Sequence, residues 1–192
     1  HRHGLPLIVD NTMATPYLLR PLEHGADIVV HSLTKFLGGH GNSMGGVIVE
    51  SGRFAWDNGH FPEMVEPSRA YHGVKFYETF GDFGYTMKAR MEVNRTFGAV
   101  LSPLSAWLLL QGAETLHLRM REHCRNARRV AEFLQQPPRV AWVNYPGLPD
   151  SPYHELARQQ FRPVDGQPGA SGILTFGIQG GAAAGERFID AC

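Results

Sequence analysis

Short apolar runs that end in polar residues mark the strands of the first third of the chain. "LPLIVDN" (residues 5–11) and "ADIVVHSL" (residues 26–33) are nearly continuous apolar runs, which is typical of strands buried on both faces of a parallel sheet. "TPYLLRPLEHG" between them predicts a short helix that ends at Gly25. This strand–helix–strand order predicts that the two strands are parallel neighbours. A third strand is predicted at "MGGVIVES".

The middle of the chain combines weak periodicity with many aromatic residues. We interpret residues 52–81 as a long surface excursion, because no clear helix or strand period runs through them. Its rings favour a subunit contact, with a substrate wall and simple packing over the sheet edge as alternatives. They belong to Trp56, Phe61, Tyr71, Phe76, Tyr77 and Phe80. Helices are predicted at residues 82–98 and 102–111, the second with Ser102 as its N-cap and Pro103 at its first position.

The second half alternates helices and strands, which predicts a smaller and separate α/β layer. The clearest helix covers residues 113–136, where apolar positions recur every three or four residues. Its apolar face comprises Leu116, Met120, Cys124, Ala127, Val130 and Leu134. A strand "VAWVNYPG", a helix "SPYHELARQQF", a loop "RPVDGQPGA", a strand "SGILTFGIQG" and the start of another helix follow. We therefore expect two domains, residues 1–112 and residues 113–192, with the long helix as the bridge.

Composition narrows the classes of function. The 192 residues are 43% apolar, enough for a folded core, and 18 basic residues balance 18 acidic ones, so no long-range field attracts nucleic acid or a membrane surface. Two distant cysteines favour a reducing compartment. No signal peptide is evident, and no apolar run approaches the roughly 20 residues of a membrane span. We expect a cytoplasmic protein. We also expect an internal piece of a longer one, because the first residues enter a central strand and the last stop within a helical pattern.

Two ionisable residues stand where the predicted parallel strands end. Asp10 closes the first strand and Lys35 follows the second, one strand–helix–strand connection later. Neighbouring strands lie about 4.8 Å apart, and ligands of parallel sheets bind beyond the carboxyl ends of the strands. The two side chains are therefore expected to flank one small, flat ligand. Taken singly, each has a plainer interpretation, since a lysine at a strand end is usually solvated and Asp10 is suited to cap the next helix.

A pyridoxal ring needs both of these groups. Its aldehyde needs a lysine, and its ring nitrogen needs a carboxylate that keeps the nitrogen protonated. Ser32 and Thr34 flank Lys35 with hydroxyl groups suited to a phosphate, and the glycines of "GGHGNSMGG" allow the backbone to pass close to a cofactor. The ten histidines form no metal motif, so we expect no metal site and interpret His31 as a satisfied strand residue. A nucleotide loop is a weaker alternative, because the GK[ST] ending is missing.

The segment "VDNTMATPYLLRPLEHGADIVVHSLTKFLGGHGNSMGG" closely resembles the Cys/Met-metabolism family of fold-type I pyridoxal-phosphate enzymes. The resemblance implies an α/β fold of the aspartate-aminotransferase-like class. Residues 1–112 would form the C-terminal part of the large cofactor-binding domain, with a mainly parallel sheet. Residues 113–192 would form the bridging helix and the first part of a small C-terminal domain. Lys35 matches the Schiff-base lysine and Asp10 the partner of the pyridine nitrogen, while Ser32 and Thr34 match hydroxyls near the phosphate.

Within that family, "SPLSAWLLLQGAETLHLRMREHCRNARRVAEFL" and "VNYPGLPDSPYHELA" are most similar to the O-acetylhomoserine sulfhydrylases. This similarity implies γ-replacement on O-acetylhomoserine by sulfide or methanethiol, in a homotetramer. Cystathionine γ-synthase or methionine γ-lyase activity, a catalytically incomplete piece, and a phosphate-binding module that uses Lys35 only as a charge stay open. Neither the acyl group nor the sulfur donor is decided. The family's upstream phosphate loop and stacking tyrosine, and its downstream carboxylate-binding arginine, have no counterpart here.

Overall fold

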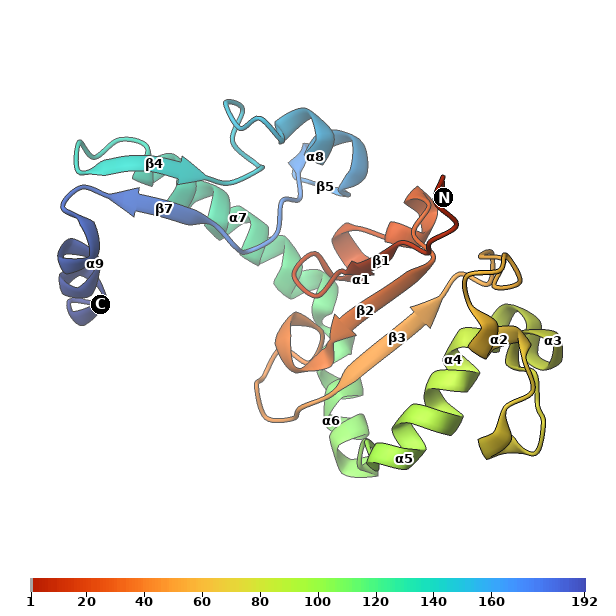
Figure 1. Cartoon of the computed structure of the whole chain (residues 1–192). Coiled ribbons are helices and arrows are strands. Elements are labelled where there is room, and N and C mark those ends of the chain that lie inside the picture. Colours follow the sequence, from red (N-terminus) through yellow and green to blue (C-terminus); the bar gives the residue numbers. More distant parts are fainter. Residues whose placement is uncertain (1) are drawn as a thin grey trace. The chain divides into compact units, whose positions relative to one another are not determined.

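The computed structural model describes residues 2–192, so His1, part of the first predicted domain, lies outside the described residues. The chain divides into two compact units (Figure 1). The first contains the residues up to Thr15 together with Arg20–Glu114. The second contains Pro16–Leu19 together with Thr115–Cys192.

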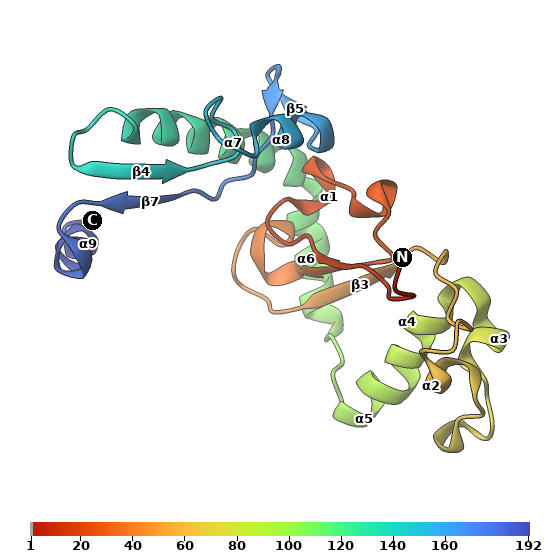
Figure 2. The ribbon, with the colours of Figure 1, turned by 45° about the horizontal axis from the view of Figure 1, so that its top comes forward.

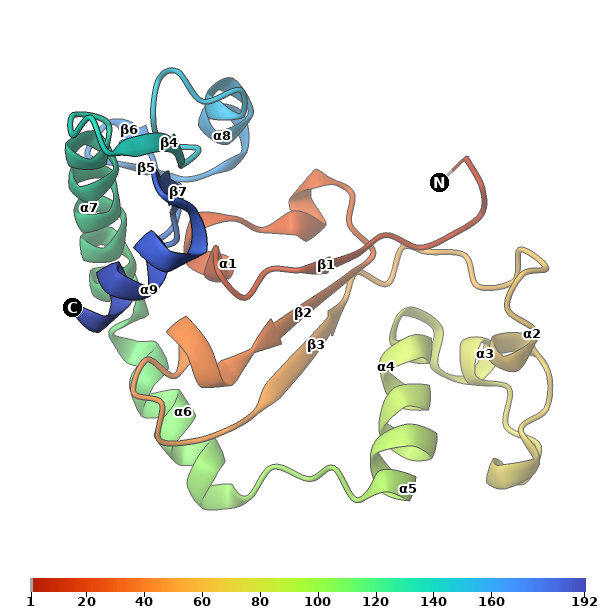
Figure 3. The same ribbon diagram turned by 60° about the vertical axis from the view of Figure 1, so that its left-hand side comes forward.

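A three-stranded sheet in the order β1-β2-β3 organises the first unit (Figure 3). Strand β1 (Ile8–Asp10) pairs in parallel with β2 (Ile28–Ser32), with Asp10 opposite Val30, so the predicted parallel pairing is confirmed. Strand β3 (Gly46–Glu50) runs antiparallel to β2, a direction that the sequence had not indicated. The chain returns from β2 through a glycine-rich turn without a crossover helix, and such a connection joins antiparallel strands.

The connection from β1 to β2 is helical and ends where expected. It consists of α1 (Thr15–Leu18) and a 3₁₀ turn, η1 (Pro21–His24). Gly25 follows with φ of 90°, and its N–H donates to the carbonyl of Pro21, which confirms the predicted glycine stop. At the other end of the strands, the carboxylate of Asp27 accepts the N–H of Leu7 at 2.8 Å, which fixes the start of the parallel pair.

The aromatic segment forms a core, so the prediction of a surface excursion was wrong. It folds into α2 (Pro62–Val65), a 3₁₀ turn η3 (Arg69–Tyr71) and α3 (Phe76–Phe80). Its apolar side chains pack on β2. The buried members of this aromatic cluster are Ile28, Phe54, Trp56, Met64 and Phe76, and the partly buried rings include Phe61, Tyr71, Tyr77 and Phe80. The ring centroids of Trp56 and Phe61 lie 5.1 Å apart at a steep angle. Irregular turns here bury rings that no periodic pattern marks.

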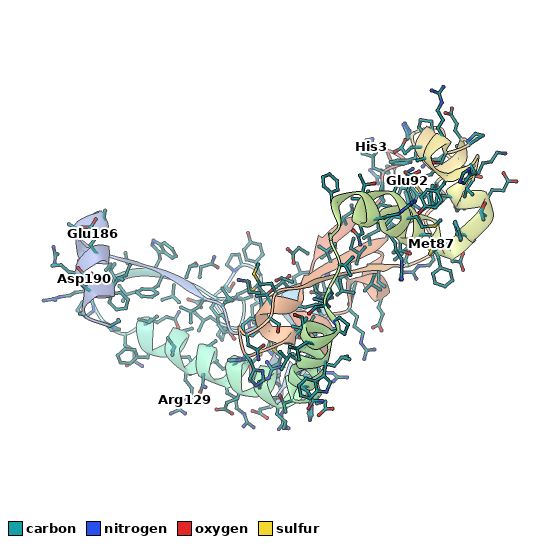
Figure 4. The ribbon with its side chains drawn as sticks, turned by 90° about the horizontal axis from the view of Figure 1, so that it is seen from below. His3, Met87, Glu92, Arg129, Glu186 and Asp190 are labelled. Carbon is teal, nitrogen blue, oxygen red and sulfur yellow. The ribbon has the colours of Figure 1, made fainter. Side chains whose placement is uncertain are left out.

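A helical segment that follows the aromatic cluster confirms the helix predicted at residues 82–98. It comprises α4 (Gly84–Lys88), a π-helical part η5 (Ala89–Asn94) and α5 (Arg95–Phe97), after a 3₁₀ turn η4 (Gly81–Phe83). Glu50 anchors its start, because its carboxylate accepts the N–H groups of Tyr85 and Thr86. Met87 packs on the aromatic cluster, and Figure 4 shows Met87 and Glu92 in this part of the first unit.

Helix α6 (Pro103–Glu114) supports the turn that follows β2. The hydroxyl of Ser102 accepts the N–H of Ser105 at 3.1 Å, which confirms the predicted N-cap. The backbone of Gly112 lies so close to that turn that an added Cβ would sit 1.9 Å from the carbonyl oxygen of Gly38. A Cβ on Gly38 would in turn lie 2.7 Å from the Leu109 side chain. The two glycines therefore permit a contact between helix and turn that no other residue type allows.

The second unit is built on α7 (Leu116–Leu134). Its buried residues are Leu116, Met120, Cys124, Ala127 and Ala131. The helix and most of its predicted apolar face are confirmed, but Val130 is 47% exposed and Ala131 takes the buried place. Because the helix has 3.6 residues per turn, its buried face drifts along the sequence and reaches Ala131 instead of Val130 near the C-terminal end. The small Ala131 side chain packs there with Tyr145.

Helix α7 lies along an antiparallel pair formed by β4 (Val140–Asn144) and β7 (Thr175–Ile178) (Figure 2). Helix α8 (His154–Gln160) precedes β7, and α9 (Gly181–Asp190) follows it. Tyr145 is fully buried in a cluster with Ala127 and Ala131 of α7, and it donates its hydroxyl to the carbonyl of Ser171 at 3.0 Å. Burial raises the pKa of this phenol well above its usual value. These strands and helices agree with the α/β alternation predicted from the sequence.

The loop predicted at residues 162–170 is instead a tight hairpin. Strands β5 (Pro163–Val164) and β6 (Gln167–Pro168) pair antiparallel around Asp165 and Gly166. These two have φ of 51° and 75°, as a two-residue hairpin turn requires, so the Asp-Gly pair was the overlooked signal. Arg125 on α7 forms two hydrogen bonds with the Asp165 carboxylate, and they hold the pKa of that carboxyl below its usual value.

The helices within residues 2–192 do not combine the length and the apolarity of a membrane span.

The first prediction concerns the aromatic cluster. Phe76→Ala should lower the free energy of unfolding by about 3–5 kcal/mol, because it removes a fully buried ring and leaves a cavity. Urea titration of the protein as its gene encodes it measures this loss. Glu78→Ala on the same short helix is the matched control and should change stability by less than about 0.5 kcal/mol, since its side chain is 72% exposed. Equal effects of the two substitutions would contradict the assignment of Phe76 to the core.

The second prediction concerns the contact of α6 with the turn. Gly112→Ala should cost about 2–3 kcal/mol, because the new methyl group overlaps the backbone of Gly38 and one of the two segments must shift. Gly185→Ala on α9 is the control, since no other described atom lies within 4 Å of its added Cβ. This control should be neutral or stabilising by up to about 1 kcal/mol. A Gly112→Ala protein as stable as the wild type, by urea titration, would refute the close contact.

Candidate active site

The candidate site lies at the carboxyl ends of the two parallel strands. Asp10 is the last residue of β1, and β2 ends at Ser32. A π-helical turn η2 (Leu33–Leu37) follows directly and carries Lys35 and Thr34. Because β1 and β2 are adjacent and parallel, the acid and the amine follow neighbouring strand ends on one edge of the sheet. The structure thus places the four predicted site residues on two adjoining segments.

Lys35 is exposed and its backbone leaves the helical region, with φ of −88° and ψ of −128°. The turn around it is held by backbone hydrogen bonds, from Gly38 to the carbonyl of Leu33 and from Gly39 to the carbonyl of Lys35, both 2.8 Å long. The chain has three lysines. Lys75 pairs with Glu78 and Lys88 with Glu92, whereas within residues 2–192 the Lys35 amine forms no ion pair or hydrogen bond. It is therefore the lysine available for covalent chemistry.

Asp10 is held by Thr12, two residues further along the chain. Its Oδ1 accepts the N–H of Thr12 at 2.9 Å, and the side chain of Thr12 also hydrogen-bonds to the carboxylate. These hydrogen bonds hold the pKa of the Asp10 carboxyl below its usual value. Asp10 does not cap the following helix, because the first N–H of α1, on Thr15, is bound by the carbonyl of Asn11. The carboxylate is thus ionised at neutral pH and exposed.

Thr12 also connects the two strand ends. Its hydroxyl oxygen accepts the N–H of Ser32 at 2.8 Å, where the backbone ladder of β1 and β2 has ended. Thr12 is 6% exposed. The sequence interpretation did not single it out. The available signal was a threonine two residues after a strand-end aspartate, a spacing at which an Asp or Thr side chain forms a local turn with the backbone.

Ser32 and Thr34 differ in what their hydroxyls do. The Thr34 hydroxyl accepts the N–H of Gly45 at 3.1 Å, which ties the turn to the start of β3. The Ser32 hydroxyl has no hydrogen-bond partner in the described part of the chain and is half-buried. Ser32 is therefore the freer donor for an anionic group, and Thr34 holds the glycine-rich segment in place.

His31 does not match the satisfied strand residue that the sequence predicted. It is 7% exposed on β2, but its Nδ1 has no hydrogen-bond partner among the described residues. Burial lowers its imidazole pKa, while a backbone hydrogen bond with Asn11 and the negative charge of Asp10 act in the opposite direction. His31 also lines a largely apolar cavity of about 1190 Å³ with residues of β3 and the helical segment, and neither Asp10 nor Lys35 lines that cavity.

The donor set fits pyridoxal phosphate better than a metal ion. The residues present supply an unpaired primary amine, a carboxylate held ionised by hydrogen bonds, and a hydroxyl free to donate to a phosphate. The described chain groups no three His, Cys, Asp or Glu side chains in a way that would hold a metal ion. The neighbouring glycine turn is held by backbone hydrogen bonds and lies next to the lysine.

Known proteins match this chain along its whole length. It is 50% identical to the O-acetyl-L-homoserine sulfhydrylase of Leptospira meyeri, over 97% of this chain and 43% of that protein. It is 48% identical to O-acetyl-L-homoserine sulfhydrylase 1 of Thermus thermophilus, with the same two shares. The chain thus spans less than half the length of these relatives.

A solved structure shares the fold. The crystal structure of a protein from Campylobacter jejuni, titled a putative O-acetylhomoserine (thiol)-lyase with N'-pyridoxyl-lysine-5'-monophosphate, superposes with a TM-score of 0.84 at 37% identity. The match covers 93% of this chain and 43% of that one, which confirms the predicted fold class of a partial fold-type I protein. The family model described as Cys/Met metabolism PLP-dependent enzyme matches residues 1–192. The chain therefore belongs to the Cys/Met metabolism family of pyridoxal-phosphate-dependent enzymes.

Proposed function

We propose that the protein containing this chain is a pyridoxal-phosphate-dependent O-acetylhomoserine sulfhydrylase. It exchanges the acetyl ester of O-acetyl-L-homoserine for sulfide, giving homocysteine and acetate, or for methanethiol, giving methionine and acetate. The observation that carries the proposal is the unpaired Lys35 amine at one strand end with the ionised Asp10 at the next. The names of the relatives from Leptospira and Thermus support this choice of substrate.

The residues of this chain divide the work by their position. Pyridoxal phosphate, when bound, supplies an aldehyde that bonds to amines and a ring that accepts an electron pair from the substrate. The Nζ of Lys35 would hold the cofactor and would serve as the base for the proton on the substrate's Cα and for the proton moved at Cβ as acetate leaves Cγ. Asp10 keeps a proton on the ring nitrogen. The hydroxyl of Ser32 and the turn braced by Thr34 receive the phosphate.

The same residues serve related reactions. Asp10 and Lys35 would support a cystathionine γ-synthase or a methionine γ-lyase equally well, so the choice of sulfhydrylase depends on the similarity to named relatives. A catalytically incomplete piece is the alternative for the chain alone, since it spans less than half of those proteins.

We further propose that the two units are parts of two domains. The first unit would be the C-terminal part of the large cofactor-binding domain, and the second the bridging helix and the first part of the small domain. The boundary at Glu114 and Thr115 supports this division. A homotetramer is proposed from the family resemblance. A cytoplasmic location is proposed because both cysteines are free and one of them, Cys192, is exposed.

The third prediction tests the cofactor lysine. After incubation with pyridoxal phosphate, reduction with borohydride and digestion, mass spectrometry should find the pyridoxyl group on Lys35 in the protein as its gene encodes it. Lys35→Ala should remove this label and lower turnover of O-acetylhomoserine with sulfide by at least about 10²–10⁴-fold, the contribution of one positioned acid–base group.

The control for this experiment is Lys75→Ala, because the Lys75 side chain is 44% exposed and its amine pairs with Glu78. It should keep both label and activity. A label on a lysine other than Lys35, or full activity of Lys35→Ala, would refute the cofactor assignment. Comparing O-acetyl with O-succinyl homoserine, and sulfide with cysteine as the sulfur donor, separates a sulfhydrylase from a cystathionine synthase. Keto-acid production without added thiol would instead indicate an eliminating lyase.

A further inference from the structure

The strand ends at the candidate site are joined through one buried side chain. The hydroxyl of Thr12 accepts the N–H of Ser32 at 2.8 Å, so the hydroxyl proton is left to point elsewhere. The side chain of Thr12 hydrogen-bonds to the Asp10 carboxylate, which leaves that proton as the donated one. The result is a relay from the backbone of Ser32, through the threonine oxygen, to the carboxylate.

The backbone of Thr12 adds a second hydrogen bond to the same carboxylate. Its N–H lies 2.9 Å from Oδ1 of Asp10, so one residue supplies two donors to one acid. Hydrogen bonds to a charged group are stronger than those between neutral groups, and those to a carboxylate favour its ionised form. Thr12 is nearly fully buried, and its side-chain oxygen accepts the N–H of Ser32. Rotating the side chain away would leave this N–H without a partner, which costs free energy.

Other groups near the carboxylate contribute less. His31 on β2 is the ionisable residue, within the described chain, whose charge acts on Asp10, and its effect is smaller than either hydrogen bond from Thr12. Partial desolvation of the carboxylate acts in the opposite direction and raises its pKa, but less than the hydrogen bonds from Thr12 lower it. Of the residues described, Thr12 therefore holds the Asp10 carboxylate most directly.

We propose that Thr12 is a positioning residue that fixes the orientation of the Asp10 carboxylate and ties it to the strand preceding Lys35. This inference depends on the proposed function, because it concerns the carboxylate assigned to the cofactor's ring nitrogen. Thr12 acts through Asp10. Through Thr12, the Asp10 carboxylate is hydrogen-bonded to Ser32, the residue that directly precedes the turn carrying Lys35.

The fourth prediction compares two substitutions of Thr12 in the cofactor-free protein as its gene encodes it. Thr12→Val keeps the shape of the side chain but removes the hydroxyl, so the Asp10 titration midpoint should rise by about 1 pH unit, as loss of a charged hydrogen bond implies. Thr12→Ser keeps the hydroxyl and should restore the wild-type midpoint to within about 0.3. The measurement is the carboxyl ¹³C shift of labelled aspartate against pH. Because the native pKa is lowered, the effect is expected on the acidic side, between the native and the raised midpoints.

His31→Gln separates the charge effect from the hydrogen bonds. It should raise the Asp10 midpoint less than Thr12→Val does, because the histidine charge is the smaller influence. A larger rise in His31→Gln, or an unchanged midpoint in Thr12→Val, would overturn the assignment to Thr12. If Thr12→Val does not fold, the relay can still be tested in the wild-type protein. With ¹⁵N-labelled serine, the Ser32 amide shift should follow the Asp10 titration, and an amide that ignores it would also overturn the relay.

The loaded protein gives a readout that distinguishes this inference from the proposed function. With ring-¹⁵N pyridoxal phosphate at pH 7.5, where Asp10 stays ionised in every variant, the ring nitrogen shift of Thr12→Ser should equal that of the wild type. The shift in Thr12→Val should differ, because its Asp10 carboxylate is no longer held in one orientation toward the ring nitrogen. If Lys35 never takes the pyridoxyl label, the proposed function fails, while the Asp10 titrations still report on the relay. If Lys35 is labelled and the ring signal of Thr12→Val equals that of the wild type, the inference fails alone.

Discussion

The parallel pairing of β1 with β2 is the constraint on which the candidate site depends. Register places Asp10 opposite Val30, so β2 extends two residues beyond the last paired position before the lysine turn begins. A shift of one residue would turn every side chain of a strand to the other face. The buried apolar residues Ile28 and Val29 prevent that shift, because they are fixed in the core. Core packing thus sets the separation of the acid from the amine, although neither belongs to the core.

The turn that carries Lys35 is supported from behind and from the side. Helix α6 presses Gly112 against Gly38, and Thr34 binds the N–H of Gly45 at the entry to β3. The antiparallel β3 matters here, because it returns the chain along β2 and brings Gly45 within reach of Thr34. An exposed amine on an otherwise mobile loop would have no fixed direction. These contacts restrict the turn while leaving the side chain of Lys35 free of partners within the described residues.

Sequence reasoning succeeded where one local pattern determines the outcome. Continuous apolar runs marked β1 and β2, and with them the places of Asp10 and Lys35; a serine before a proline marked the start of α6. It failed where the outcome depends on partners distant in sequence. The burial of Trp56 and Phe76 arises from rings meeting across short turns, and no period announces it. Thr12 combines both cases, because its spacing from Asp10 was a local signal, whereas its hydrogen bond with Ser32 arises only through the strand register.

The hydrogen bonds from Thr12 lower the pKa of Asp10, and this effect matters most when a ligand ring covers the carboxylate. Burial is not the cause, because the carboxylate is exposed and desolvation acts to raise its pKa. Any flat ligand placed over the strand ends removes water from the carboxylate, which by itself favours the neutral acid. Two hydrogen bonds from Thr12 oppose that change, and they are local to the chain, so they persist when solvent is excluded. A carboxylate held by solvation alone would be neutralised more easily when a ring covers it. One that also accepts hydrogen bonds from a buried threonine keeps that stabilisation under the ring, so the relay acts from below the surface on an acid that lies on it.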